Sequence, residues 1–159
     1  MAKTFTEVIA GFDKVIDALP GLILKETEKG ALGALALVDL RITETGINST
    51  GSKFVDYTPA YKKAKTKKGR YRGFVDFQDS GQMLASTTTG FENIQPTQRS
   101  VTNANANVSF DGRDQFTRNK LSGNNKTRPG FLNPSADEMR IVTKTANEEL
   151  EKDIKELLA

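Results

Sequence analysis

The sequence predicts an α+β protein, with helices near both ends of the chain and short strands between them. A capping box followed by an apolar stripe marks a helix after Thr4 and another after Ser135. Between these helices, short apolar and polar alternations are separated by Asn, Gly and Pro, a pattern typical of strands and turns. A chain of 159 residues matches about one domain. We therefore expect a single domain over residues 1–159.

The first helix is predicted to begin after Thr4, because Thr4 and Glu7 fit the S/T-x-x-E capping pattern. Apolar residues follow with helical spacing at Phe5, Val8, Ile9, Phe12, Val15, Ile16 and Leu19. Pro20 is expected to stop or restart this helix, and a second helix is predicted from near Pro20 to about Thr45. We interpret both stripes as core or a helix–helix seam. A membrane surface is disfavoured because the polar faces mix Asp, Glu and Lys.

Residues 46–73 are predicted to form a long extended loop, or arm. Gly46 to Ser52 is rich in turn-forming residues. Between Tyr61 and Gly73 the chain then carries seven Lys or Arg and no acid, a composition that favours exposure over burial. The residues assigned to this docking arm are Phe54, Tyr57, Tyr61, Lys62, Lys63, Lys65, Lys67, Lys68, Arg70 and Arg72.

The rest of the chain alternates between strand-like and polar segments before a final helix. Residues 74–77 read as a half-buried strand, and residues 82–85 as a short helix. Further strand-like pieces are expected at 90–94, 99–102 and 107–110, with an antiparallel turn at 103–107 and a polar loop at 119–130. The last helix is predicted to follow Ser135 and to be acidic, with seven Asp or Glu against four Lys or Arg.

The composition excludes most familiar enzyme mechanisms. The chain has no His and no Cys, which removes the commonest general base, thiol nucleophiles and thiolate or imidazole metal sites. Asp76 and Asp79 flank a strand end without the geometry of an acid–base pair, and Ser80 is interpreted as a helix cap instead of half of a Ser/Lys dyad. No phosphate-binding glycine loop is present. We expect no catalysis, no cofactor and no metal.

Three interpretations of the basic arm remain open on composition alone. Its cations and the interleaved Tyr57, Tyr61, Tyr71 and Phe74 suit binding to nucleic acid, through phosphates and stacked bases. They equally suit docking on an acidic protein surface, or a solvated loop. The overall net charge of +3 does not decide between them. The most apolar segment, 31–40, is shorter than the roughly 20 residues that cross a bilayer, so we expect a soluble, unsecreted protein.

Three segments in order resemble a pattern found in phage virion proteins. Gly46 to Phe54 fits a G-x-D/N-x-x-G-x-x-F loop, and Tyr57 to Lys63 fits a Y-S/T-x-x-Y-basic segment. Phe74 to Ser86 is similar to a V-D-L-x-x-T/S-G-x-M-L-x-S unit, and Arg128 to Glu138 to an R-P-F-L-G-x-S-x-x-D/E segment. The motif residues are Gly51, Phe74, Phe77, Gly81, Met83, Leu84, Arg128, Pro129, Phe131 and Leu132. The chain resembles the tail-completion or virion morphogenesis proteins of double-stranded DNA phages.

This resemblance implies a structural protein of the phage neck. The implied fold is a small antiparallel β-sheet packed by N-terminal and C-terminal helices, with subunits closing into a ring of six or twelve copies. The implied partners are further copies of the chain, portal, adaptor and tail proteins, and the genomic DNA in the lumen. The implied location is the virion neck, assembled in the host cytoplasm. The alternative from composition is a small nucleic-acid-binding protein using the Lys62–Arg72 arm.

Overall fold

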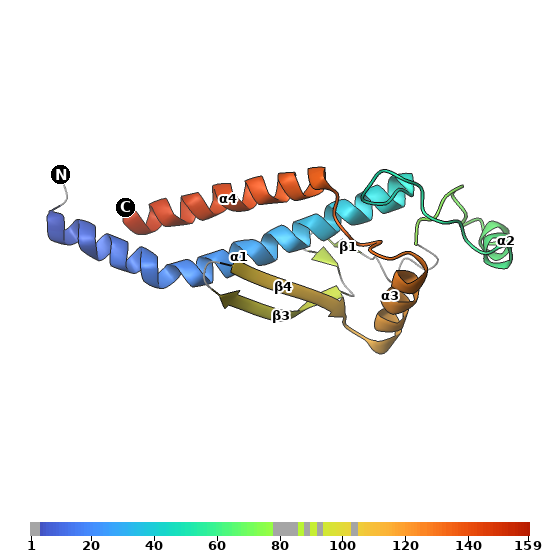
Figure 1. Cartoon of the computed structure of the whole chain (residues 1–159), viewed down its shortest axis with the longest axis horizontal. Helices are drawn as coiled ribbons and strands as arrows, with labels where there is room; N and C mark the ends of the chain where they lie inside the picture. The colour runs from blue at the N-terminus through green and yellow to red at the C-terminus, as the bar shows by residue number, and fades with distance from the viewer. Residues whose placement is uncertain (1–3, 78–85, 88–89, 92–93, 103–104) are drawn as a thin grey trace.

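The computed structural model describes residues 4–77, 86–87, 90–91, 94–102 and 105–159, and these form an elongated molecule. Figure 1 shows a long helix running almost the full length of the molecule, with a second helix beside it. A β-hairpin lies along the opposite side of the long helix, and two short helices lie near its C-terminal end. We call the two long helices the stem.

The long helix α1 (Phe5–Thr45) begins where the sequence predicts. Thr4 and Glu7 form both hydrogen bonds of the capping box, and Gly46 ends the helix with φ +65°. The expectation that Pro20 stops the helix is wrong, because α1 continues through it. Pro20 is exposed, so water can satisfy the carbonyl that loses its hydrogen bond. Figure 1 shows that α1 changes direction in its N-terminal half, as an internal proline causes.

Helix α4 (Ala136–Leu158) packs antiparallel on α1 and confirms the predicted final helix and its capping box at Ser135. Glycines on α1 allow a close approach. A Cβ built at Gly33 would lie 3.4 Å from Val142 Cγ1, and one at Gly11 would lie 3.5 Å from Leu158 Cδ2. The interpretation of the stripe at residues 5–19 as core or seam is wrong for most of its members, because Phe5, Val8, Ile9, Phe12 and Ile16 are exposed and only Val15 and Leu19 are half-buried.

Arg41 connects the two stem helices where α1 ends and α4 begins. The Arg41 guanidinium donates to Glu138 Oε1 at 2.8 Å, to the Ile47 carbonyl at 2.6 Å and to the Asn133 carbonyl at 3.0 Å. It therefore joins the end of α1, the start of α4 and the loop that follows α1. Burial opposes ionisation of Glu138, but Arg41 and the Ser135 backbone N–H outweigh it and hold the Glu138 pKa below its usual range.

The predicted α+β class is wrong, because the described chain is mostly helical and no sheet is packed between the terminal helices. The strands form two separate antiparallel pairs. The strands β1 (Ser86–Thr87) and β2 (Gly90–Phe91) pair over two residues, and β3 (Ile94–Thr102) and β4 (Asn105–Gly112) form a hairpin. Strand-like pieces at 90–94, 99–102 and 107–110 do overlap these strands. Neither pair gains a third strand within the described residues, where the long helices dominate the architecture.

Two other expectations are corrected by short helices. Helix α2 (Pro59–Lys67) lies inside the segment expected to be an extended arm, with Pro59 at its first position. Helix α3 (Gln115–Thr127) covers most of the expected polar loop at 119–130, because Asp114 caps its first turn. Residues 74–77 are irregular, not a strand. The predicted helix at 82–85 lies outside the described residues.

The core is small and lies where α1 ends. Its buried members are Val38 and Ile42 of α1, with Val75, Phe77 and Phe131 from the segments before and after the hairpin region. Leu35, Phe54, Tyr57, Phe110, Leu121 and Leu132 pack around them. This core joins the stem to the end of the molecule that holds α2 and α3.

Prediction for the end of α1. Gly46→Ala should destabilise the protein far more than Gly51→Ala. Both glycines have positive φ, which costs an L-residue about 1–2 kcal/mol. A Cβ at Gly46 would also overlap the Phe74 ring, whereas a Cβ at Gly51 meets nothing within 4 Å. Urea unfolding of both variants measures the difference, and equal losses would contradict a close approach of Phe74.

Candidate assembly surface at the basic tip

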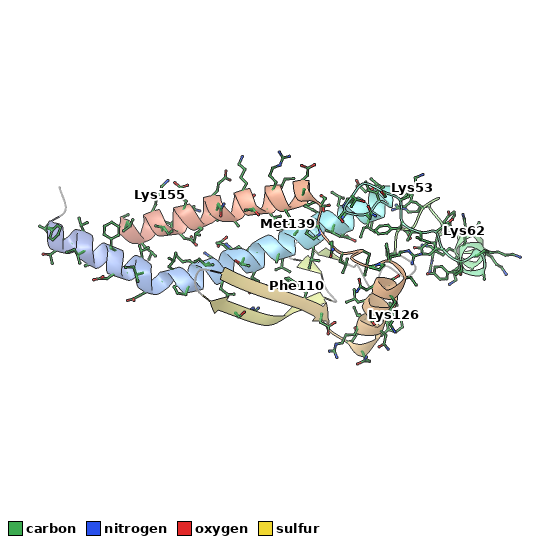
Figure 2. All side chains as sticks on the ribbon, viewed as in Figure 1. Lys53, Lys62, Phe110, Lys126, Met139 and Lys155 are labelled. Carbon is green, nitrogen blue, oxygen red and sulfur yellow. The ribbon has the colours of Figure 1, made fainter. Side chains whose placement is uncertain are left out.

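Positive charge is concentrated at one end of the molecule. We define the basic tip as residues 46–77 and 111–128, which hold 13 Lys or Arg and 4 Asp, a net charge of +9. The stem helices α1 and α4 hold 8 Lys or Arg and 14 Asp or Glu, a net charge of −6. Figure 2 shows Lys53, Lys62 and Lys126 at the tip, with Lys155 on the stem. The sequence indicates a basic arm and an acidic last helix, and the fold adds the cations of α3 to the arm.

A buried ion pair anchors the arm to the body. Lys65 and Asp76 are each 1% exposed, and Lys65 Nζ lies 2.5 Å from Asp76 Oδ1. The Tyr57 hydroxyl donates to the same oxygen at 2.9 Å and accepts from the Phe77 backbone N–H at 3.0 Å. Lys65 comes from α2, so the pair fixes this helix against the chain that leads out of the arm. We call Tyr57, Lys65 and Asp76 the anchor cluster.

Aromatic rings continue the anchor cluster into the core. The Phe77 ring stacks on Phe131, with ring centroids 4.7 Å apart. It also forms a T-shaped contact with Phe54, with ring centroids 5.0 Å apart. Phe77 itself has φ +53°, a left-handed conformation that an L-residue adopts only when its surroundings impose it. The hydrogen bond to Tyr57 and the two ring contacts supply that constraint.

Arg128 ties α3 to the arm. Its guanidinium donates to the Val55 carbonyl at 3.0 Å and lies over the Tyr57 and Phe77 rings, 5.5 and 5.4 Å from their centroids. A planar cation between two ring faces combines charge with stacking, which Arg does better than Lys. The tip is therefore a folded unit held by its own contacts, although the arm was expected to be extended.

The protonation states at the tip follow from this packing. Burial raises the pKa of the Tyr57 hydroxyl well above its usual range, and the neighbouring Asp76 carboxylate raises it further. On the surface, the hydrogen bond from Lys62 holds the pKa of Asp56 below its usual range. Tyr57 therefore stays protonated, and so remains a hydrogen-bond donor to Asp76, throughout the neutral range.

The structure separates the predicted arm residues into two groups. Lys65 is buried, and Phe54 and Tyr57 are half-buried against the core. The Lys62 side chain is 41% exposed and pairs with Asp56 at 2.7 Å. The remaining predicted arm residues are exposed: Tyr61, Lys63, Lys67, Lys68, Arg70 and Arg72.

The predicted motif residues also divide. Phe77 and Phe131 are buried in the core, Leu132 borders it, Phe74 is half-buried beside Gly46, and Gly51 forms an open turn. Gly81, Met83 and Leu84 lie outside the described residues, as do Asp79 and Ser80. The pairing of Asp76 with Lys65 was not predicted, because the two residues read as a turn carboxylate and a surface cation. The available signal was that Asp76 is the first acid after the basic block, eleven residues from Lys65.

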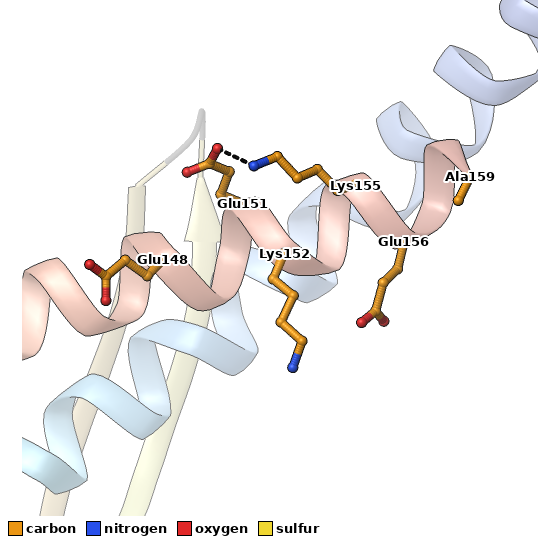
Figure 3. A pocket seen from close by; sticks show the side chains of 6 residues that line it. All are labelled: Glu148, Glu151, Lys152, Lys155, Glu156 and Ala159. Carbon is orange, nitrogen blue, oxygen red and sulfur yellow. Dashed lines mark ion pairs between the residues drawn. The ribbon is translucent and has the colours of Figure 1, made fainter.

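Among the described residues, no group of three or more His, Cys, Asp or Glu side chains is placed to hold a metal ion. The anchor cluster is closed to solvent at Lys65 and Asp76. Figure 3 shows a shallow pocket along the last turns of α4, where Glu151 and Lys155 pair at 2.6 Å and the other charged side chains point in different directions. Such a pocket offers no converging polar groups for a substrate.

Within the described part of the chain, none of the helices combines the length and apolar character needed to span a bilayer. The chain matches no protein-family model, no curated protein and no solved structure.

Prediction for the ion pair. Lys65→Met should cost about 3–5 kcal/mol of unfolding free energy, because it leaves a buried carboxylate unpaired. Asp76→Asn should cost a similar amount, and the double variant should lose less than the sum of the two. Lys63→Met on the exposed side of α2 is the control and should change stability by less than about 0.5 kcal/mol. Additive losses in urea unfolding would contradict direct pairing.

Prediction for alkaline pH. The folded-state pKa of Tyr57 lies above its unfolded value, so its contribution to stability is complete below about pH 10 and is lost as pH rises further. Unfolding free energies measured between about pH 9 and 11 should fall more steeply for the wild type than for Tyr57→Phe. Parallel curves would mean that Tyr57 ionises alike in both states.

Proposed function

We propose that this protein is a non-enzymatic structural subunit that assembles head to tail with copies of itself, as a component of a phage neck. The observation that carries the proposal is the separation of charge along one molecule, with +9 at the basic tip and −6 on the stem. A heterologous interface needs two different, complementary surfaces on each subunit, and it closes into a ring when its rotation allows. The tip and the acidic stem supply such surfaces.

The rigidity of the tip supports the same function. The anchor cluster and Arg128 hold α2 and α3 in one arrangement, so the exposed cations are presented without the ordering cost of a mobile arm. Attraction between opposite charges then orients the subunits as they meet.

The neck assignment rests on the sequence resemblance. Its motif residues Phe77, Phe131 and Leu132 come from distant segments and pack around one core, which gives them a shared structural role. In such a neck the ring of six or twelve copies would contact portal, adaptor and tail proteins, and DNA would pass through its lumen.

A second candidate function is binding to nucleic acid through the tip. The net charge of +9, with exposed Tyr61 among the cations, favours contacts to phosphates. In that case affinity for DNA would fall steeply with salt and the free chain would be monomeric. Light scattering and fluorescence anisotropy with a DNA duplex separate the two functions.

Prediction for assembly. Reversing three exposed tip cations, as Lys63→Glu, Lys67→Glu and Lys68→Glu, should abolish oligomers while the circular dichroism spectrum stays that of the wild type. The physical reason is that like charges would then face each other at the interface. Light scattering should show oligomers for the wild type and a 17.4 kDa monomer for the triple variant.

The matched control reverses three cations of the stem, Lys14, Lys144 and Lys152, with the same change in net charge. This variant should still assemble, because it makes the acidic surface more acidic. A monomeric wild type, or oligomers that survive the tip reversal, would contradict the proposed function. Lys65 is excluded from the test because its reversal would unfold the tip.

A further inference from the structure

Most of the excess negative charge of the stem lies at one end. Residues 4–19, at the start of α1, and residues 147–159, at the end of α4, hold 8 Asp or Glu and 3 Lys, a net charge of −5. These segments are neighbours, because a Cβ at Gly11 would lie 3.5 Å from Leu158 Cδ2. We call the two segments the acidic end. The rest of the stem holds 6 Asp or Glu and 5 Lys or Arg, a net charge of −1.

The acidic end and the basic tip lie at opposite ends of the elongated molecule. Figure 1 shows the start of α1 and the end of α4 at one end, and α2 at the other. Along α1, Ile16 and Gly46 are about 45 Å apart at 1.5 Å per residue. This is several times the screening length of about 8 Å in physiological salt, so the two charged surfaces attract each other little within one chain. They can meet only between copies.

Several carboxylates of the acidic end are available to a partner. Asp13, Asp17 and Glu156 are exposed, and no ion pair or hydrogen bond joins their side chains to other described residues. By contrast, Asp153 and Glu151 are already paired with Lys25 and Lys155. The uncompensated charge therefore lies partly on the first turns of α1.

An apolar row lies inside the acidic end. Four large side chains of α1, each between 45% and 80% exposed, form it: Phe5, Ile9, Phe12 and Ile16. Their spacing of four, three and four places them on one face of the helix, and we call them the open stripe. At 100° per residue, Asp13 and Asp17 lie within about a third of a turn of the middle of the open stripe. The acidic end is thus an apolar surface beside carboxylates.

The basic tip has the complementary composition. Phe116 on α3 is 55% exposed, and Lys120 Nζ lies 4.0 Å from the centroid of its ring. Val55 in the arm is 75% exposed, and its carbonyl accepts from Arg128 at 3.0 Å. Exposed apolar side chains therefore lie among cations at the tip, as the open stripe lies among carboxylates at the acidic end.

We propose that the acidic end of one copy docks on the basic tip of the next copy, with the open stripe inside the contact. This inference rests on the proposed function and locates the acidic half of the head-to-tail interface. A surface of net charge −5 attracts one of +9, whereas two acidic ends or two tips would repel each other. Burial of apolar side chains from both surfaces then stabilises the contact.

The absence of cysteine from the chain permits a direct test. Thr6→Cys in the acidic end and Asn119→Cys beside Phe116 are made in separate full-length chains, mixed, and treated with a short bis-maleimide. Thr145→Cys, another exposed threonine of the stem, replaces Thr6→Cys in the control. Denaturing gels should show about tenfold more mixed dimer with Thr6→Cys, because docking raises the effective concentration of the two thiols.

Three outcomes of the cross-linking would overturn the inference. Dimers of Thr6→Cys with itself in place of mixed dimers would mean that two acidic ends pair, as in an isologous contact. Equal yields with Thr145→Cys would mean random encounter. Binding of the wild type, but not of Phe12→Gln with Ile16→Gln, to anionic phospholipid vesicles without any mixed dimer would assign the open stripe to a membrane surface.

A second measurement separates this inference from the proposed function. Asp13→Lys with Asp17→Lys lowers the charge of the acidic end from −5 to −1 and should leave the 17.4 kDa chain in light scattering, with an unchanged circular dichroism spectrum. The control Glu44→Lys with Asp137→Lys makes the same change on exposed stem positions outside the acidic end and should assemble normally.

The two proposals fail in different ways. Oligomers that survive reversal of the acidic end but not reversal of the tip would overturn the inference alone. A monomeric wild type would overturn both the inference and the proposed function.

Discussion

The packing of α4 along α1 is the interaction on which the rest of the structure depends. The described core has few buried apolar side chains, and they gather at one end of α1. Elsewhere the stem is held by small residues that let the helices approach, by ion pairs such as Lys25 with Asp153 at 2.6 Å, and by the Arg41 junction at its far end. Without α4, the long helix would lose the main cover of its seam, and only the β-strands and the small core at its C-terminal end would still pack on it.

The basic tip is under a different physical constraint, because it must hold many like charges on one folded surface. Repulsion among its cations would favour an extended chain. One lysine is instead withdrawn into the interior and neutralised by Asp76, and Arg128 is placed over aromatic rings. Lys65 and Arg128 therefore hold the tip together, while cations such as Lys63 and Lys67 stay on the surface. A buried pair of this kind specifies one arrangement more than it adds stability.

Local signals in the sequence were sufficient for the helix ends but not for the architecture. Thr4 and Ser135 cap helices because the capping box needs only four neighbouring residues. The helix end predicted at Pro20 was wrong, because the effect of an internal proline depends on whether the freed carbonyl faces water. The tertiary structure decides that, and a local sequence pattern does not show it. Helix α2 was not predicted because its many lysines favoured an exposed loop. The role of Lys65 was not predicted because it depends on Asp76, eleven residues along the chain. The fold class failed for the same reason: strands were recognisable, but whether they join into one sheet is decided by distant edges.

The order of the elements along the chain has a consequence for synthesis. Lys25 and Asp153, which meet in the finished stem, are separated by 128 residues. Helix α1 therefore leaves the ribosome before the helix that covers its seam has been made. During that interval a growing chain carries an uncovered apolar rod, and neighbouring nascent chains can pair through it before their own α4 arrives. Closing so long a loop is also slow, so the stem is expected to be the late step of folding.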